Sequence, residues 1–78
     1  MHRLSIGMLV IDIRERHVGN VSELLGDCFL VDRKHPPQTW NLTQDALFNV
    51  DSERATLVCE LQELHRYGCL THGVKLRA

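Results

Sequence analysis

Residues 7–25 read GMLVIDIRERHVGNVSELL, and this stretch decides the fold of the chain. Two runs rich in β-branched and aliphatic residues flank the charged link at residues 14–16, which is typical of a β-hairpin. Gly19 interrupts the second run, and a glycine inside a strand marks a bulge or a tight bend, which lets a small barrel curl. Residues 8–13 are apolar on both alternating faces. We therefore expect the first strand to be buried on both faces or to meet another subunit.

Short β-rich runs separated by turn signals continue through most of the chain. Gly26 with Asp27 indicates one break, and the consecutive prolines Pro36 and Pro37 indicate the clearest loop. The expected strands cover residues 8–13, 18–21, 28–31, 39–42, 47–50 and 54–58. Short strands at this close spacing are typical of a small barrel.

Two helical segments interrupt or follow these strands. Residues 43–46 are expected to form one helical turn, with Thr43 at its N-cap. From Leu57 the apolar spacing becomes helical, which predicts a short amphipathic helix over residues 59–67 that Gly68 closes. The remaining residues end in Lys75 and Arg77 and are interpreted as a tail.

The order and spacing of several short motifs are informative together. The motifs are Gly7-Met8 with Val10, Val18-Gly19 with Val21, Phe29-Leu30-Val31, Trp40-Asn41-Leu42, Asp45-Ala46-Leu47 with Val50, and Arg54 to Leu57. Over residues 4–58 they resemble the PRC-barrel family, which includes the cytoplasmic part of the photosynthetic reaction-centre H subunit and the C-terminal domain of a bacterial 16S ribosome maturation factor. The resemblance implies a mainly β fold: a small six-stranded, SH3-like barrel that serves as a docking or assembly module without catalytic residues.

The chain departs from this family in three places. The family often has a glycine in its first turn, where this chain has Glu15 and Arg16. The loop that contains Pro36 and Pro37 and the cysteine-rich segment after Val58 also look particular to this protein. We therefore expect one PRC-barrel-like domain over residues 1–78, with the barrel at about 4–58 and the helix and tail at 59–78.

Size and charge limit the classes of function. The chain has 78 residues and a net charge of −1, with acids and bases mixed along it. A domain this small buries a small core, and its charge gives no strong case for nucleic acid or anionic membranes. The sequence has no apolar run long enough to span a bilayer and no apolar core of a signal peptide, so we expect a cytoplasmic protein.

The cysteines and histidines near the C-terminus suggest a zinc site but do not form a strong one. Cys69 and His72 have usable ligand spacing, whereas strong zinc sites carry tight paired knuckles. Cys59 and His65 are six residues apart on one expected helix, so they would point to different faces. Three widely spaced cysteines favour free thiols over disulfides. We expect no metal and no cofactor.

Other polar groups have simple structural interpretations. Cys28 lies in an apolar run and is expected to be a core thiol rather than a nucleophile. Carboxylates gather around the first hairpin, and we interpret them as solvated strand ends and turns rather than as catalytic pairs. They are Asp12, Glu15, Glu23 and Asp27. The sequence therefore predicts a protein that is not an enzyme.

A basic patch supports a different hypothesis. Basic residues occur in the first turn and in the third link, with an aromatic residue close by. They are Arg14, Arg16, Arg33 and Lys34, together with Trp40. If both loops reach one end of a barrel, they would form an RNA- or ribosome-associated surface with an aromatic platform. The nearby acids Asp12, Glu15 and Asp32 dilute this charge.

The leading hypothesis is a non-enzymatic protein-interaction module whose partner the sequence does not identify. An excess of apolar residues on the first strand and the expected helix also predicts a homodimer. The candidate interface comprises Leu9, Ile11, Ile13, Leu61 and Leu64. Alternatively, the helical residues close one end of their own barrel.

Overall fold

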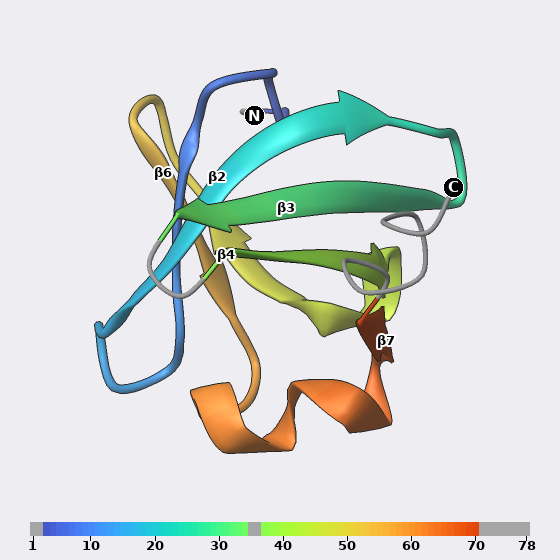
Figure 1. Cartoon of the computed structure of the whole chain (residues 1–78). Coiled ribbons are helices and arrows are strands. Elements are labelled where there is room, and N and C mark those ends of the chain that lie inside the picture. Colours follow the sequence, from blue (N-terminus) through green and yellow to red (C-terminus); the bar gives the residue numbers. More distant parts are fainter. Residues whose placement is uncertain (1–2, 35–36, 71–78) are drawn as a thin grey trace.

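A computed structural model describes residues 3–34 and 37–70 of the chain (Figure 1). The described residues form seven strands and two short 3₁₀ helices. The strands are β1 (Leu9–Ile11), β2 (His17–Leu24), β3 (Cys28–Lys34), β4 (Pro37–Thr43), β5 (Leu47–Val50), β6 (Arg54–Leu57) and β7 (Gly68–Leu70). The helices are η1 (Gln44–Ala46), which connects β4 to β5, and η2 (Leu61–Arg66), which precedes β7.

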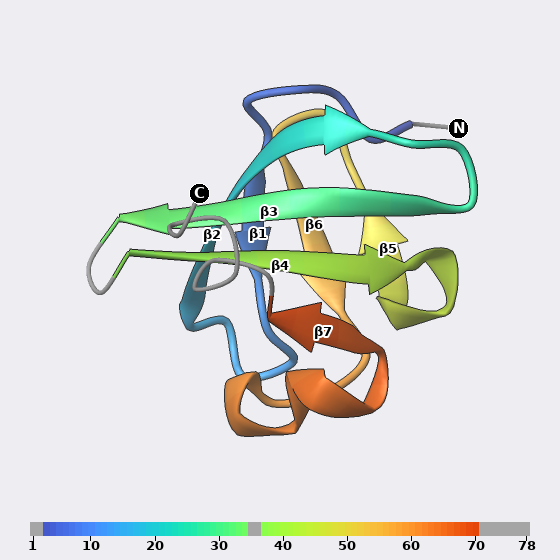
Figure 2. The same cartoon turned by 45° about the vertical axis from the view of Figure 1, so that its right-hand side comes forward.

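All seven strands belong to one strongly curved sheet in the order β5-β6-β1-β2-β3-β4-β7. Neighbouring strands are antiparallel except β1 and β6, which are parallel. The predicted mainly β fold is confirmed. The closed six-stranded barrel is not, because β5 and β7 each pair with one neighbour within the described residues and remain at the two edges (Figure 2). A seventh strand, β7, extends the sheet beyond β4.

The predicted hairpin is formed by β1 and β2. Val10 pairs with Gly19 and Ile11 pairs with His17, so one extra residue of β2 forms the bulge that the glycine predicted. A Cβ atom on Gly19 would collide with the backbone carbonyl of Asp32 on β3. Gly19 is therefore needed because β2 and β3 approach closely where the sheet bends.

The core fills the concave side of this sheet. Its largest fully buried side chains come from five strands and from η2, and they are Val10, Val18, Val21, Phe29, Val31, Leu42, Leu57 and Leu64. The sequence analysis expected the first strand to be buried on both faces, and the structure bears this out for part of it. Val10 joins the core, Ile11 is buried outside the main core cluster, and Ile13 is 41% exposed.

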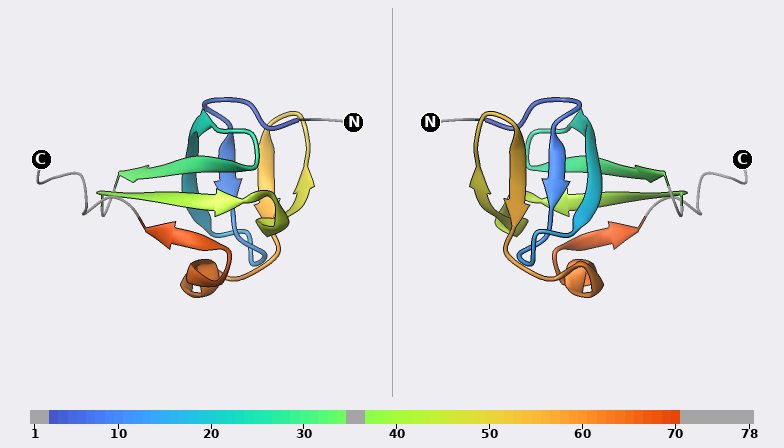
Figure 3. Two further views of the ribbon diagram at one scale, coloured as in Figure 1. Left: turned by 90° about the vertical axis from the view of Figure 1, so that its right-hand side faces the viewer. Right: turned by 90° about the vertical axis from the view of Figure 1, so that its left-hand side faces the viewer.

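The predicted amphipathic helix over residues 59–67 is wrong in type and extent. Val58 and Cys59 lie in a bend, Glu60 is extended, and the six residues of η2 form a 3₁₀ helix. Tyr67 is the C-cap of η2, and Gly68 begins β7. A Cβ atom on Gly68 would collide with the carbonyl of Asn41 on β4, so the close approach of β7 to β4 requires glycine there. Leu64 is fully buried in the core, so η2 covers one end of the curved sheet (Figure 3).

The predicted helical turn at residues 43–46 corresponds to η1. Thr43 occupies the N-cap position but makes no side-chain capping bond, and its hydroxyl instead donates to the carbonyl of Tyr67 at 3.1 Å. This bond ties the end of β4 to the end of η2. The side chains of Cys69 and Leu70 and all of residues 71–78, including His72, lie outside the description. No helix among the described residues is long and apolar enough to cross a membrane.

Candidate interaction site

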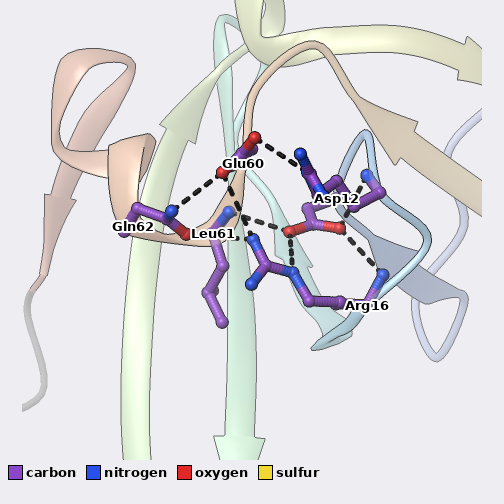
Figure 4. Close-up of polar contacts among 6 residues, drawn as sticks. Asp12, Arg16, Glu60, Leu61 and Gln62 are labelled. Carbon is purple, nitrogen blue, oxygen red and sulfur yellow. Dashed lines mark hydrogen bonds and ion pairs between the residues drawn. The ribbon is translucent and has the colours of Figure 1, made fainter.

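Asp12 lies at the end of β1 and is the one charged residue among the buried residues described. Its Oδ1 accepts the backbone N–H groups of Arg14 at 2.9 Å and Arg16 at 2.8 Å. Its Oδ2 accepts the Arg16 Nε–H and the backbone N–H of Leu61, both at 2.9 Å (Figure 4). The prediction that Asp12 is a solvated strand end is therefore wrong, because a segment 49 residues away covers it.

A second layer of charge surrounds this carboxylate. Arg14 Nε lies 2.9 Å from Glu60 Oε2, and Arg16 Nη2 lies 3.7 Å from Glu60 Oε1. Arg16 Nη2 also donates to Gln62 Oε1 at 2.9 Å. These contacts hold the start of η2 against the loop between β1 and β2 (Figure 4).

The pKa of Asp12 reflects its opposing surroundings. Burial alone raises the pKa of a carboxyl group, but the hydrogen bonds from Arg16, Leu61 and Arg14 lower it further than burial raises it. The pKa of Asp12 is consequently below its ordinary value of 3.8. Both oxygens of the Asp12 carboxylate already accept hydrogen bonds, four in total, so Asp12 is unsuited to accept a proton as a general base.

The structure places the predicted basic residues at one end of the sheet, but their surroundings differ. Arg14 and Arg16 are engaged with Asp12 and Glu60. Arg33 and Lys34 instead line an open pocket of about 360 Å³ on β2 and β3. The other residues that line this pocket are His17, Asn20 and Asp32.

Trp40 is not an exposed platform beside these cations. It pairs with Val31 across β3 and β4, is half-buried, and packs against the core. Its Nε1 is buried and has no hydrogen-bond partner within residues 3–34 and 37–70. An aromatic ring that faces the core is poorly placed to stack on a base.

The predicted interface residues are mostly covered by their own chain. Leu64 is fully buried and Ile11 is 5% exposed, while Leu9 and Leu61 are half-buried. Leu61 and Leu64 contribute to the core, so the alternative that η2 closes its own sheet describes them better. Ile13 remains as the exposed member of the set.

A different apolar surface lies at the opposite end of the sheet. The N-terminal segment, the turn between β2 and β3, η1 and β5 lie on one side of the molecule (Figure 2). Residues of these segments line an open groove of about 380 Å³. Its apolar lining residues are Leu4, Leu24, Leu47 and Val50, and its other lining residues are Arg3, Gly26 and Gln44. We call this the edge groove, because one of its walls is the edge strand β5.

Large apolar side chains are exposed on two of the segments that form the edge groove. Leu24 and Leu25 at the turn are 44% and 46% exposed, and Phe48 on β5 is 67% exposed. Phe48 is the extra residue of a bulge, because Leu47 pairs with Leu57 while Asn49 pairs with Thr56. The sequence signal for this surface was the pair of leucines directly before Gly26, which lie outside the expected strands.

Two of the cysteines are free thiols in this structure, Cys28 and Cys59. Cys28 is half-buried, whereas Cys59 is buried. Burial raises the pKa of the Cys59 thiol, and the negative charges of Glu63 and Asp12 raise it further. In the part of the chain that is described, no group of three or more potential ligands could hold a metal ion.

Comparisons with models of known protein families, with curated proteins and with solved structures found no match. The PRC-barrel resemblance therefore remains a hypothesis that rests on the motifs within residues 4–58. A function has to be inferred from the residues and geometry of this chain.

Proposed function

We propose that this protein is a non-enzymatic interaction module of PRC-barrel type that binds a protein partner at the edge groove. The observation that carries the proposal is an apolar groove beside an edge strand, with Leu24 in its lining 44% exposed. Exposed apolar clusters with polar surroundings mark interaction sites more often than scattered apolar residues do.

The edge strand adds a second reason. β5 reads Leu47-Phe48-Asn49-Val50 and carries no charge and no proline. Natural edge strands are protected by lysine, proline, a covering segment, a bulge or short length, because their free backbone groups pair with other chains; β5 has four residues and the bulge at Phe48 but neither lysine nor proline. An extended segment of a partner can thus add to β5 through its backbone while its side chains enter the groove.

The charged cluster around Asp12 supports a structural role at the other end of the sheet. Its carboxylate is fully buried and accepts four hydrogen bonds, and Arg14 and Arg16 bind acidic side chains of the same chain. Such saturated groups orient a loop and a helix rather than react with a substrate. The cluster therefore fixes the loop between β1 and β2 against η2, and we assign it a structural role.

The alternative is an RNA- or ribosome-associated small barrel. The pocket that contains His17, Arg33 and Lys34 favours it, since these side chains can bind phosphate. The ion pairs of Arg14 and Arg16 and the inward position of Trp40 remove much of the surface that it requires. Binding that weakens steeply with added salt would favour this alternative.

Affinity capture from the native source tests the proposal with matched variants. Leu24→Ser removes an exposed apolar side chain from the edge groove, whereas Ile13→Ser removes one of similar exposure elsewhere. We expect a partner that the wild-type chain and Ile13→Ser retain and that Leu24→Ser loses. Circular dichroism must show that all three chains are folded. Equal retention by Leu24→Ser would refute the edge groove as the site.

A further inference from the structure

We propose that the pocket on β2 and β3 binds a small polyhydroxylated ligand that carries a phosphate monoester, such as a sugar phosphate. The residues that line this pocket are His17, Asn20, Asp32, Arg33 and Lys34, and we call it the basic pocket. None of these residues lines the edge groove, so the inference goes beyond the proposed function and does not depend on it.

The basic side chains of the basic pocket are available to a ligand. Among the described residues, no hydrogen bond or ion pair engages the side chain of His17, Arg33 or Lys34. The other two cations predicted for this surface, Arg14 and Arg16, are engaged by acidic side chains of the same chain. The predicted basic residues without such an ion pair therefore line a single pocket.

The three basic side chains suit a terminal phosphate group. Lysine and arginine each present several N–H donors, and a histidine imidazole presents at least one in either charge state. A phosphate monoester carries a charge of about −1.5 to −2 at neutral pH and has three oxygens that accept strong hydrogen bonds. A carboxylate has two such oxygens. Phosphate is therefore the better complement to three donor side chains around one pocket.

The other lining residues of the basic pocket offer acceptors for hydroxyl groups. Asn20 and Asp32 are partners across β2 and β3. The amide nitrogen of Asn20 donates to the carbonyl of Gly7 at 3.1 Å, which leaves the amide oxygen as an acceptor. Asp32 Oδ1 accepts the Thr39 hydroxyl at 2.9 Å, and Asp32 Oδ2 has no partner among the described residues. Both free oxygens can accept hydrogen bonds from a sugar.

A second pocket continues this surface along β2 and β3. It has a volume of about 430 Å³ and shares Asn20, Asp32 and Lys34 with the basic pocket. Asp32 and Lys34 are two residues apart on β3, so they face the same side with their Cα atoms roughly 6.6 Å apart. A phosphate bound at Lys34 thus leaves the carbons that bear hydroxyl groups beside Asp32. The negative charge of Asp32 disfavours a second anionic group at that position.

The size of the basic pocket favours a small molecule over RNA. Its volume of about 360 Å³ lies near the lower end of the range for small-molecule sites, roughly 300–1,000 Å³. A nucleic-acid strand requires a cationic path along successive phosphates and aromatic rings on which its bases stack. Here Asp32 interrupts the positive charge, and Trp40 packs against the core.

NMR titration of the isotope-labelled full chain with ribose 5-phosphate tests this inference. Ribose and inorganic phosphate are the matched probes, and all titrations use the same low salt concentration, because salt screens exposed charges. We expect ribose 5-phosphate to shift the amides of Asn20, Asp32 and Lys34. It should bind about tenfold more tightly than inorganic phosphate, because hydrogen bonds to its hydroxyl groups add to the phosphate contacts. Ribose at the same concentration should leave these amides unchanged.

Variants of the chain separate the two halves of the basic pocket. Arg33→Gln with Lys34→Gln should weaken ribose 5-phosphate about tenfold, whereas Arg66→Gln, which changes an exposed arginine of η2, should not. Asp32→Ala removes a hydroxyl acceptor and a repulsive charge. It should weaken ribose 5-phosphate relative to inorganic phosphate and so narrow the preference. The amide spectrum of each variant shows whether it is folded.

Three results would overturn the inference. The first is equal binding of ribose 5-phosphate and inorganic phosphate, which would leave only an unselective anion patch. The second is the absence of shifts at Asn20, Asp32 and Lys34 with about 10 mM ribose 5-phosphate. The third is tighter binding of a short oligouridylate without a terminal phosphate, with shifts that extend to Arg14 and Arg16, which would assign this surface to RNA.

Discussion

Replacement of Asp12 by asparagine is the perturbation that most directly tests how the fold is held together. The amide oxygen of the new side chain can still accept the two backbone N–H groups that Oδ1 accepts, but its NH₂ group would face two donors, Arg16 Nε and the Leu61 N–H. Hydrogen bonds to charged groups contribute about 1.5–3 kcal/mol, and exposed pairs contribute less. Since Arg16 is half-exposed, most of the loss comes from Leu61.

We expect Asp12→Asn to lower the free energy of unfolding by about 3 kcal/mol. For a domain of this size the melting temperature should fall by about 12–24 °C. Urea denaturation with linear extrapolation measures the first quantity. Amide hydrogen exchange adds a local readout, because the Leu61 N–H should lose more protection than the backbone of β2.

Asp45→Asn is the matched control for this substitution. Asp45 is exposed, so the same chemical change there should alter the free energy of unfolding by less than about 0.5 kcal/mol. A loss below about 1 kcal/mol for Asp12→Asn, or an unchanged Leu61 exchange rate, would refute the view that Asp12 holds η2 on the sheet.

The remaining predictions concern acid, packing and association. The pKa of Asp12 is lower in the folded state, so its ionised carboxylate stabilises the fold above the ordinary value of 3.8, and this contribution is lost as pH falls through the folded-state pKa. Urea titrations at a series of pH values should show this loss of stability. The Asp12→Asn variant should show less of it. Gly19→Ala should destabilise the chain by about 1–3 kcal/mol, since its Cβ would meet the backbone of Asp32, and a melting temperature equal to wild type would contradict this. The apolar excess of the first strand, of which Ile13 is 41% exposed, leads us to expect a dimer at roughly 100 μM, and light scattering that gives the mass of one chain would contradict it.

Local patterns predicted the parts of the fold that depend on neighbouring residues. The β-branched runs on either side of residues 14–16 indicated the hairpin, and Gly19 indicated its bulge. Both features depend on backbone preferences and on the alternation of side chains, which a sequence shows directly. For the same reason the position of η1 could be predicted from Thr43 and the residues after it.

Features that depend on distant segments were missed. The spacing of Leu61 and Leu64 showed an apolar stripe but not whether it faced its own core or a second subunit. Asp12 was interpreted as a solvated turn residue because its neighbours in sequence do not indicate that the N–H of Leu61 donates to its carboxylate. The edge groove is assembled from four separate segments, so no single run of residues could reveal it.

The basic patch shows the same limit in electrostatics. Four basic residues near two predicted turns indicated one cationic surface, yet the fold pairs Arg14 with Glu60 and Arg16 with Asp12. Whether a charge is free depends on partners that can be distant in sequence, and Glu60 lies 46 residues from Arg14.

Amide chemical-shift mapping by NMR locates the surface on which the partner binds. The isotope-labelled full chain is titrated with the captured partner. Binding at the edge groove should give the largest shifts at Leu24, Gln44 and Leu47, with little change at His17 and Lys34. Shifts that concentrate at His17, Arg33 and Lys34 would instead place the partner on the basic pocket and contradict binding at the edge groove.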